Sequence, residues 1–144
     1  MKYESITNLE QENRQLLVRR TREMISRFLP VQDQDETSIM VTLDEFYLQI
    51  LFSDIHPLMV LYLARAIDRS VTAKDFRLIN DLNLQSVLGG HALNTDIGCY
   101  TYRSTHWLNG ELSQQRMMEM LNRCVEDAKR GYLRFNPREK ERYL

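Results

Sequence analysis

Cys99 and His91 are two residues whose types could do chemistry together. If the segment between them folds as a hairpin with the loop Asn94–Asp96, Cys99 lies opposite His91 and Gly90 lies opposite Tyr100. A neighbouring imidazolium lowers the pKa of a thiol and makes it a nucleophile. No catalytic signature surrounds Cys99, so a cross-strand pair without chemistry is the favoured interpretation. A small thiol-dependent enzyme or redox sensor centred on this pair is the alternative.

Metal binding is the second chemistry to consider. The residues with suitable side chains are His56, His91, His106, Asp96 and Cys99. No pair among them has the short spacing typical of zinc ligands. We therefore expect no metal, no cofactor and no catalytic residues.

Arginines form a basic stripe on the first predicted helix, at Arg19, Arg20, Arg22 and Arg27. Such a stripe could contact nucleic acid or an acidic peptide. Short clusters of this kind are more often a solvated helix face, and the chain as a whole has 19 basic and 20 acidic residues, for a formal charge of −1. We therefore expect no nucleic acid partner.

Length and composition predict one soluble domain. The chain has 144 residues, of which 43% are hydrophobic. A domain of this size buries roughly 68–70% of its unfolded surface, so it needs no disulfide or metal. No signal peptide and no membrane span is visible, and the two cysteines are expected to be free thiols. We expect a cytoplasmic protein with no membrane partner, formed by residues 1–144 with a core over about 35–131.

Periodicity changes from helical to strand-like after the polar segment "QDQDET" at 32–37. Apolar residues at three- and four-residue steps predict a helix over about 7–29, which Pro30 stops. Alternating apolar residues then predict two strands, over about 39–43 and 46–52, joined by a turn at Asp44-Glu45. Residues 58–66 suit a helix or a strand, and we predict a third strand because it completes the sheet.

The second half of the chain reads as helix, hairpin and helix. Thr72 with Asp75 three residues later predicts a capped helix over about 73–84. Two strands follow, over about 86–93 and 97–105. Ser113 is the expected cap of the last helix, which Gly131 is expected to end, leaving a polar tail over 132–144. The predicted fold is α+β, in the order α-β-β-β-α-β-β-α, with both long helices packed on a five-stranded antiparallel sheet.

Both faces of that sheet are apolar. One face of the first two strands carries Ile39, Val41, Leu43, Phe46, Leu48, Ile50 and Phe52, and the other still shows Met40, Tyr47 and Leu51. A solvated antiparallel face is normally mainly polar. The second face is therefore expected to be covered by a helix of the chain itself, by a second subunit or by a peptide.

Three segments in the second half resemble the YbjN family, a branch of the type III secretion chaperone-like fold. They are "INDLNLQSVLGG", "GCYTYRSTHWLNG" and "SQQRMMEMLNRCVEDA", within a resemblance that covers about residues 35–131. Asn80 and Asn83 match the asparagine-bearing helix of the family. The resemblance implies a small α+β domain that is often a homodimer. Secretion chaperones of this fold hold an extended effector segment without catalysis, and YbjN-type proteins are regulators. The chain lacks the strong acidic excess of dedicated effector chaperones.

We therefore expect a non-enzymatic peptide- or protein-binding module, chaperone-like or regulatory, that forms a homodimer. The expected contact surface surrounds the middle helix and the hairpin. Its residues are Phe76, Ile79, Asn80, Asn83, Tyr100, Tyr102 and Trp107.

Overall fold

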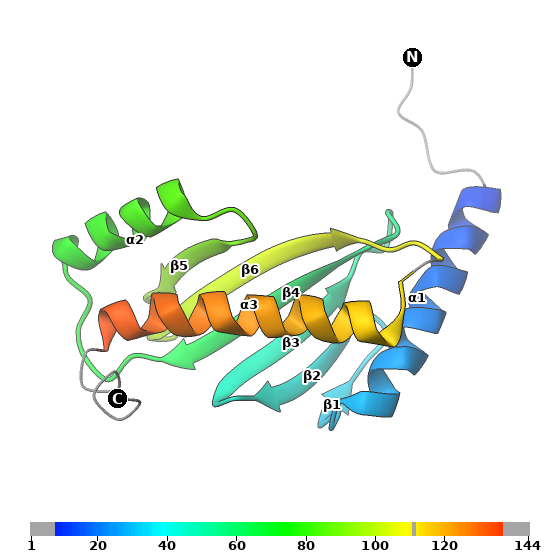
Figure 1. Cartoon of the computed structure of the whole chain (residues 1–144), viewed down its shortest axis with the longest axis horizontal. Helices are drawn as coiled ribbons and strands as arrows, with labels where there is room; N and C mark the ends of the chain where they lie inside the picture. Colours follow the sequence, from blue (N-terminus) through cyan, green and yellow to red (C-terminus); the bar gives the residue numbers. More distant parts are fainter. Residues whose placement is uncertain (1–7, 111, 137–144) are drawn as a thin grey trace, which may run out of the picture.

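An antiparallel sheet of six strands, in the order β1-β2-β3-β4-β6-β5, forms the framework of the fold. In the computed structural model, which describes residues 8–110 and 112–136, three helices accompany it (Figure 1). The elements are α1 (Asn8–Phe28), β1 (Asp33–Gln34), β2 (Ser38–Leu43), β3 (Phe46–Phe52), β4 (Leu58–Ala66), α2 (Ala73–Gln85), β5 (Gly90–Asn94), β6 (Cys99–Trp107) and α3 (Gln114–Phe135). The α+β class, the three helices and the antiparallel pairing are as predicted, and residues 58–66 form a strand.

The sixth strand, β1, lies in the segment predicted to be a linker. Its two residues pair with Ile39 and Met40 of β2. The side chain of Asp35 shapes the turn between them, because one of its oxygens accepts hydrogen bonds from the backbone N–H groups of Thr37 and Ser38, at 2.8 and 2.9 Å. A two-residue polar strand has no alternating pattern, so the prediction of five strands was wrong by this edge strand.

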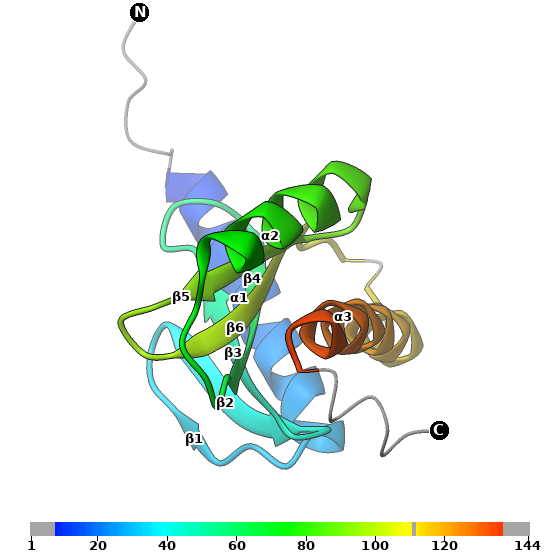
Figure 2. The ribbon, with the colours of Figure 1, turned by 90° about the vertical axis from the view of Figure 1, so that its left-hand side faces the viewer.

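The two long helices, α1 and α3, pack against one face of the sheet, as the contacts of Phe52 with Arg22 and of Tyr100 with Tyr132 show. Figure 2 shows α3 on one side of the strands and α2 beyond the edge strand β5. The strand residues under the helices form most of the core, with Met117, Leu121 and Val125 of α3 above them. These strand residues are Ile39, Val41, Phe46, Leu48, Ile50, Phe52, Met59, Leu61, Leu63, Tyr100 and Tyr102. We call this side the helix face.

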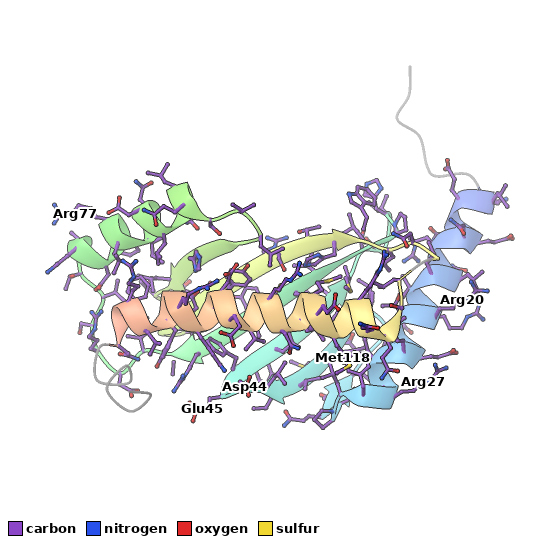
Figure 3. The ribbon with its side chains drawn as sticks, viewed as in Figure 1. Arg20, Arg27, Asp44, Glu45, Arg77 and Met118 are labelled. Carbon is purple, nitrogen blue, oxygen red and sulfur yellow. The ribbon has the colours of Figure 1, made fainter. Side chains whose placement is uncertain are left out.

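The turn between β2 and β3 lies beside α3 at the edge of the helix layer, where Figure 3 labels Asp44 and Glu45. Both residues have positive φ angles, +50° and +69°, as a tight hairpin turn requires. Asp44 is paired with Lys129 of α3 at 3.3 Å, and Glu45 with Arg65 of β4 at 2.6 Å. The turn predicted at this dipeptide is therefore confirmed, and ion pairs join it to its neighbours.

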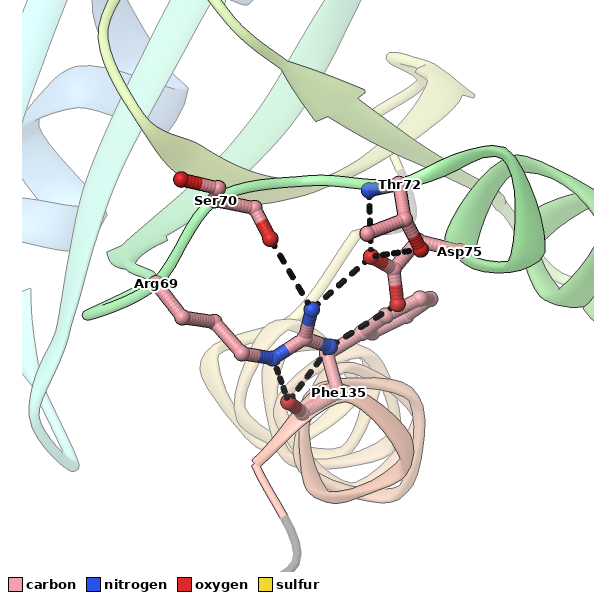
Figure 4. Close-up of polar contacts among 5 residues, drawn as sticks. All are labelled: Arg69, Ser70, Thr72, Asp75 and Phe135. Carbon is pink, nitrogen blue, oxygen red and sulfur yellow. Dashed lines mark hydrogen bonds and ion pairs between the residues drawn. The ribbon is translucent and has the colours of Figure 1, made fainter.

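Arg69 ties the middle helix to the end of α3 (Figure 4). Its guanidinium donates to both oxygens of Asp75 at 2.8 Å and to the backbone carbonyl of Phe135 at 2.9 and 3.1 Å. Asp75 also accepts from the backbone N–H of Thr72, which completes the predicted capping box. Hydrogen bonds from Arg69 hold the pKa of Asp75 well below its ordinary value, so this carboxylate stays charged. The cap thus fixes the start of α2 against the end of α3.

The hairpin of β5 and β6 has a different register from the predicted one. His91 pairs with Tyr102, and Cys99 pairs with Asn94. The loop is one residue longer than expected, over 95–98, and Gly98 adopts φ +66° in it. The expected pairing of His91 with Cys99 was therefore wrong.

Helix α3 continues past Gly131 to Phe135, so the predicted helix end was also wrong. Gly131 serves a close approach rather than a turn, because a Cβ there would meet the Tyr100 hydroxyl and would lie 2.6 Å from Nδ1 of His91. Beyond it, Tyr132 and Phe135 are buried in the core, and the Tyr132 hydroxyl donates to the carbonyl of Ala66. Residues 137–144 of the predicted tail lie outside the described residues.

Replacing Gly131 with alanine should lower the free energy of unfolding by about 1–3 kcal/mol, the usual cost of overpacking. In an open helix the same change would stabilise by about 1 kcal/mol, so the sign of the effect reports the close packing. Urea unfolding measures it. Gly110→Ala is the matched control, since no described atom lies within 4 Å of a Cβ at that position. Gly131→Ala more stable than the wild type would contradict this packing.

Candidate protein-binding surface

The sheet face turned away from the helices is the candidate surface, and we call it the open face. Residues on the helix face contact α1 and α3, as Phe52 does with Arg22, Tyr100 with Tyr132, and Ser104 with Cys124. Their strand neighbours therefore point to the other side. The large apolar residues of the open face are Met40, Tyr47, Leu51, Leu58, Val60, Tyr62 and Trp107.

Strand register places these side chains next to one another. Leu51 lies opposite Val60, and Leu58 lies opposite Trp107. Trp107 is 65% exposed and contacts the ring of His56 edge-on, with the ring centroids 6.0 Å apart. Across β2 to β6, the only charged residue pointing to this side is Arg103. The surface is therefore less polar than a solvated antiparallel face normally is.

The surface expected from the sequence is not one surface. Tyr100 and Tyr102 are fully buried on the helix face, because the register turns them under α3. Phe76 of α2 is 49% exposed, Ile79 packs partly against the core and Asn80 is exposed beside them. Trp107 lies on the open face. Two separate apolar regions, on α2 and on the open face, therefore replace the predicted one.

Asn83 holds α2 against the edge strand β5. Its side-chain amide donates to the carbonyl of His91 at 2.9 Å, and its oxygen accepts from the His91 backbone N–H at 2.8 Å. This is the pair of hydrogen bonds that another strand would make. Asn83 therefore occupies the β5 edge at His91, where an added strand would otherwise bind.

A buried cluster of polar rings lies beneath Gly131. Nδ1 of His91 is 2.6 Å from the Tyr100 hydroxyl, and the Tyr102 hydroxyl donates to Asp127 at 3.1 Å. Burial lowers the pKa of His91 and raises the pKa values of both tyrosines far above their usual range. Both phenols therefore keep their protons, and the Tyr100 hydroxyl shares a hydrogen bond with Nδ1 of a neutral His91. The cluster is therefore suited to satisfying buried polar groups at the end of the core rather than to transferring protons.

The thiols do not form the predicted pair with histidine. Cys99 and His91 point to opposite faces of the sheet, and the Cys99 thiol is 3.6 Å from the carbonyl of Ile97. Cys124 is buried, and its burial raises the pKa of its thiol, which lies 3.3 Å from the Ser104 hydroxyl. The structure therefore does not bring Cys99 and His91 together as that alternative requires. Within the described residues, no three His, Cys, Asp or Glu side chains are grouped as metal ligands.

Comparison with known proteins identifies the fold. No protein-family model and no curated protein matches the chain. The structure of YbjN, a proposed transcription regulator from E. coli, matches with a TM-score of 0.66 and 8% identity, over 85% of this chain and 93% of that chain. A chain in the HopA1–SchA chaperone–effector complex matches with a TM-score of 0.55 and 13% identity, over 86% and 95%.

These likenesses confirm the predicted resemblance at the level of the fold. The chain has the architecture seen in YbjN and in a chaperone–effector complex, and identities this low show the fold alone. None of the described helices is long and apolar enough to cross a lipid bilayer.

The buried His91 should make stability depend on pH. Because its pKa is lowered in the folded state, the neutral ring stabilises the fold above the unfolded pKa near 6.5, and this contribution is lost as the pH falls through the lower folded value. We expect the free energy of unfolding of the wild type to decrease as the pH drops below about 6. The decline should be shallower in His91→Gln, whose side chain does not titrate.

Denaturant unfolding at several pH values measures this difference. His56→Gln is the matched control, because His56 lies exposed in a loop. His106 is also partly buried with a lowered pKa, so a smaller pH dependence should remain in the His91 variant. Equal slopes for wild type and His91→Gln would contradict the account of the cluster.

Proposed function

We propose that this chain is a non-enzymatic protein-binding module whose binding surface is the open face. The observation that carries the proposal is a sheet side with one charged residue across five strands, opposite the side that contacts α1 and α3. Burial of large side chains such as Leu51, Tyr62 and Trp107 in an interface would lower the free energy of the protein relative to leaving them in water. The fold's occurrence in a chaperone–effector complex supports a protein as the partner.

The size of the open face suits a protein contact. Five strands spaced about 4.8 Å apart and about seven residues long cover roughly 19 by 23 Å. An apolar patch above a few hundred Å² is rare on a monomer unless it binds something. Small-molecule sites are usually concave pockets, whereas the outer side of a sheet is an extended surface, which favours another protein surface as its partner.

We infer that a second copy of the chain is the partner on this face. A two-fold axis brings a patch against its own copy, so the interface needs no other gene product. Two sheets packed face to face would bury Leu51, Leu58 and Tyr62 from both copies, in the manner of a β-sandwich. The region around Phe76 on α2 is the competing contact, and the experiment below separates the two.

A lysine on the open face should prevent self-association. We expect the wild type to sediment as a dimer of the 17.2 kDa chain at micromolar concentration. Tyr47→Lys and Leu51→Lys should sediment as monomers, because a two-fold interface would bury two unpaired charges. Both positions face away from the core, so the variants should stay folded by circular dichroism.

Two exposed positions elsewhere provide matched controls. Met118→Lys on the outer side of α3 should remain dimeric, and so should Phe76→Lys on α2 (Figure 3). A wild type that is monomeric throughout the range would contradict the self-association. If Phe76→Lys were the only variant to dissociate the dimer, the interface would lie at α2 instead of the open face.

A further inference from the structure

A groove of about 890 Å³ runs along α1, between this helix and the segments that follow β1 and β3. Val18 and Phe52 line it, and of the two Val18 is partly exposed while Phe52 is buried under Arg22. Phe52 belongs to the helix face, so the groove lies on the helix side of the sheet. A partner in this groove and a partner on the open face would not compete for the same residues.

Two arginines of the groove are fixed by neutral oxygens. Arg14 donates to the carbonyl of Ser53 at 2.7 Å, and Arg22 donates to the carbonyl of Glu36 at 3.1 Å. The Arg22 guanidinium also lies 5.5 Å from the centre of the Phe52 ring. Neither side chain makes an ion pair with a carboxylate in the described chain, so no neighbouring carboxylate offsets the positive charge of either guanidinium group.

Two further arginines, Arg19 and Arg27, line the groove from exposed positions on α1. Among the described residues neither has an ion-pair partner. They are eight positions apart, which is about 12 Å along a helix and about the length of three to four residues of extended chain. A peptide lying along α1 could therefore reach both with alternate acidic side chains.

We propose that this groove binds an acidic, partly apolar segment of a protein partner. Its carboxylates would pair with Arg19 and Arg27, where guanidinium groups favour bidentate contacts, while its apolar side chains would lie over Val18. The site is additional to the proposed self-association and does not depend on it.

Acidic residues in the groove favour a peptide over a nucleic acid. Glu23, Glu36 and Asp54 also line it, and they would repel a continuous phosphate backbone. A peptide can place its charges beside the arginines and its neutral residues beside these carboxylates. Phe52 is covered by Arg22, so it offers no free ring on which a base could stack.

Fluorescence polarisation with the full-length chain tests the proposal. The probe is a labelled peptide of alternating acidic residues and leucine, and its control has every Asp and Glu replaced by Asn and Gln. We expect the acidic peptide to bind and the amide peptide not to bind. Arg19→Glu combined with Arg27→Glu should weaken binding about tenfold or more, and added salt should weaken it too.

Matched charge reversals elsewhere control for the change in net charge. Arg77→Glu on α2 (Figure 3) and Arg123→Glu on α3, both at exposed positions away from α1, should leave binding nearly unchanged. Arg14 and Arg22 are left intact because they hold α1 to the sheet, and thermal unfolding confirms that each variant is folded. The proposal would be overturned if the control charge reversals weakened peptide binding as much as those at Arg19 and Arg27. It would also be overturned if the acidic peptide did not bind. An oligonucleotide whose binding is weakened more by the Arg19 and Arg27 substitutions than the binding of the peptide is would also overturn it.

Discussion

Placement of both long helices, α1 and α3, on the same face of the sheet is the constraint on which the rest of this structure depends. Alternate strand residues meet α1 and α3 there and form a continuous core, so one face supplies most of the burial that folding needs. Three features hold α3 in place: its close approach to the sheet at Gly131, the buried ring of His91 beneath it, and the hydrogen bonds from Arg69 to the carbonyl of Phe135. The other face carries Leu51, Tyr62 and Trp107, opposite the side that contacts α1 and α3.

Local signals in the sequence predicted most of the elements. Pro30 marks the end of α1, Thr72 with Asp75 marks the start of α2, and the apolar run 58–66 is a strand as expected. Nonlocal features were harder to predict. Strand β1 is only two polar residues paired through their backbone, and the hairpin loop begins one residue later and ends two residues later than expected. This difference changes which side chains meet across the hairpin, and the pairing of β6 with β4 places Tyr100 and Tyr102 in the core rather than on the surface.

The candidate site was predictable only in part. The apolar second face follows from the alternation of residues in β2 and β3, but the sequence does not reveal which side the helices choose. Asn83 attracts attention as a polar residue on an amphipathic helix, yet its role is to satisfy the edge of β5. The arginine groove is also hidden in the sequence, because it forms only when α1 lies beside the end of β3.

The sole tryptophan of the chain, Trp107, gives the most direct test of the central claim, because it lies on the open face. Its emission and its quenching by acrylamide should be followed as the protein is concentrated. If the open face is covered by another copy, the emission moves to shorter wavelength and quenching falls as concentration rises. Both changes should be absent in Leu51→Lys. An emission maximum and a quenching constant that stay the same across the whole range would contradict the claim.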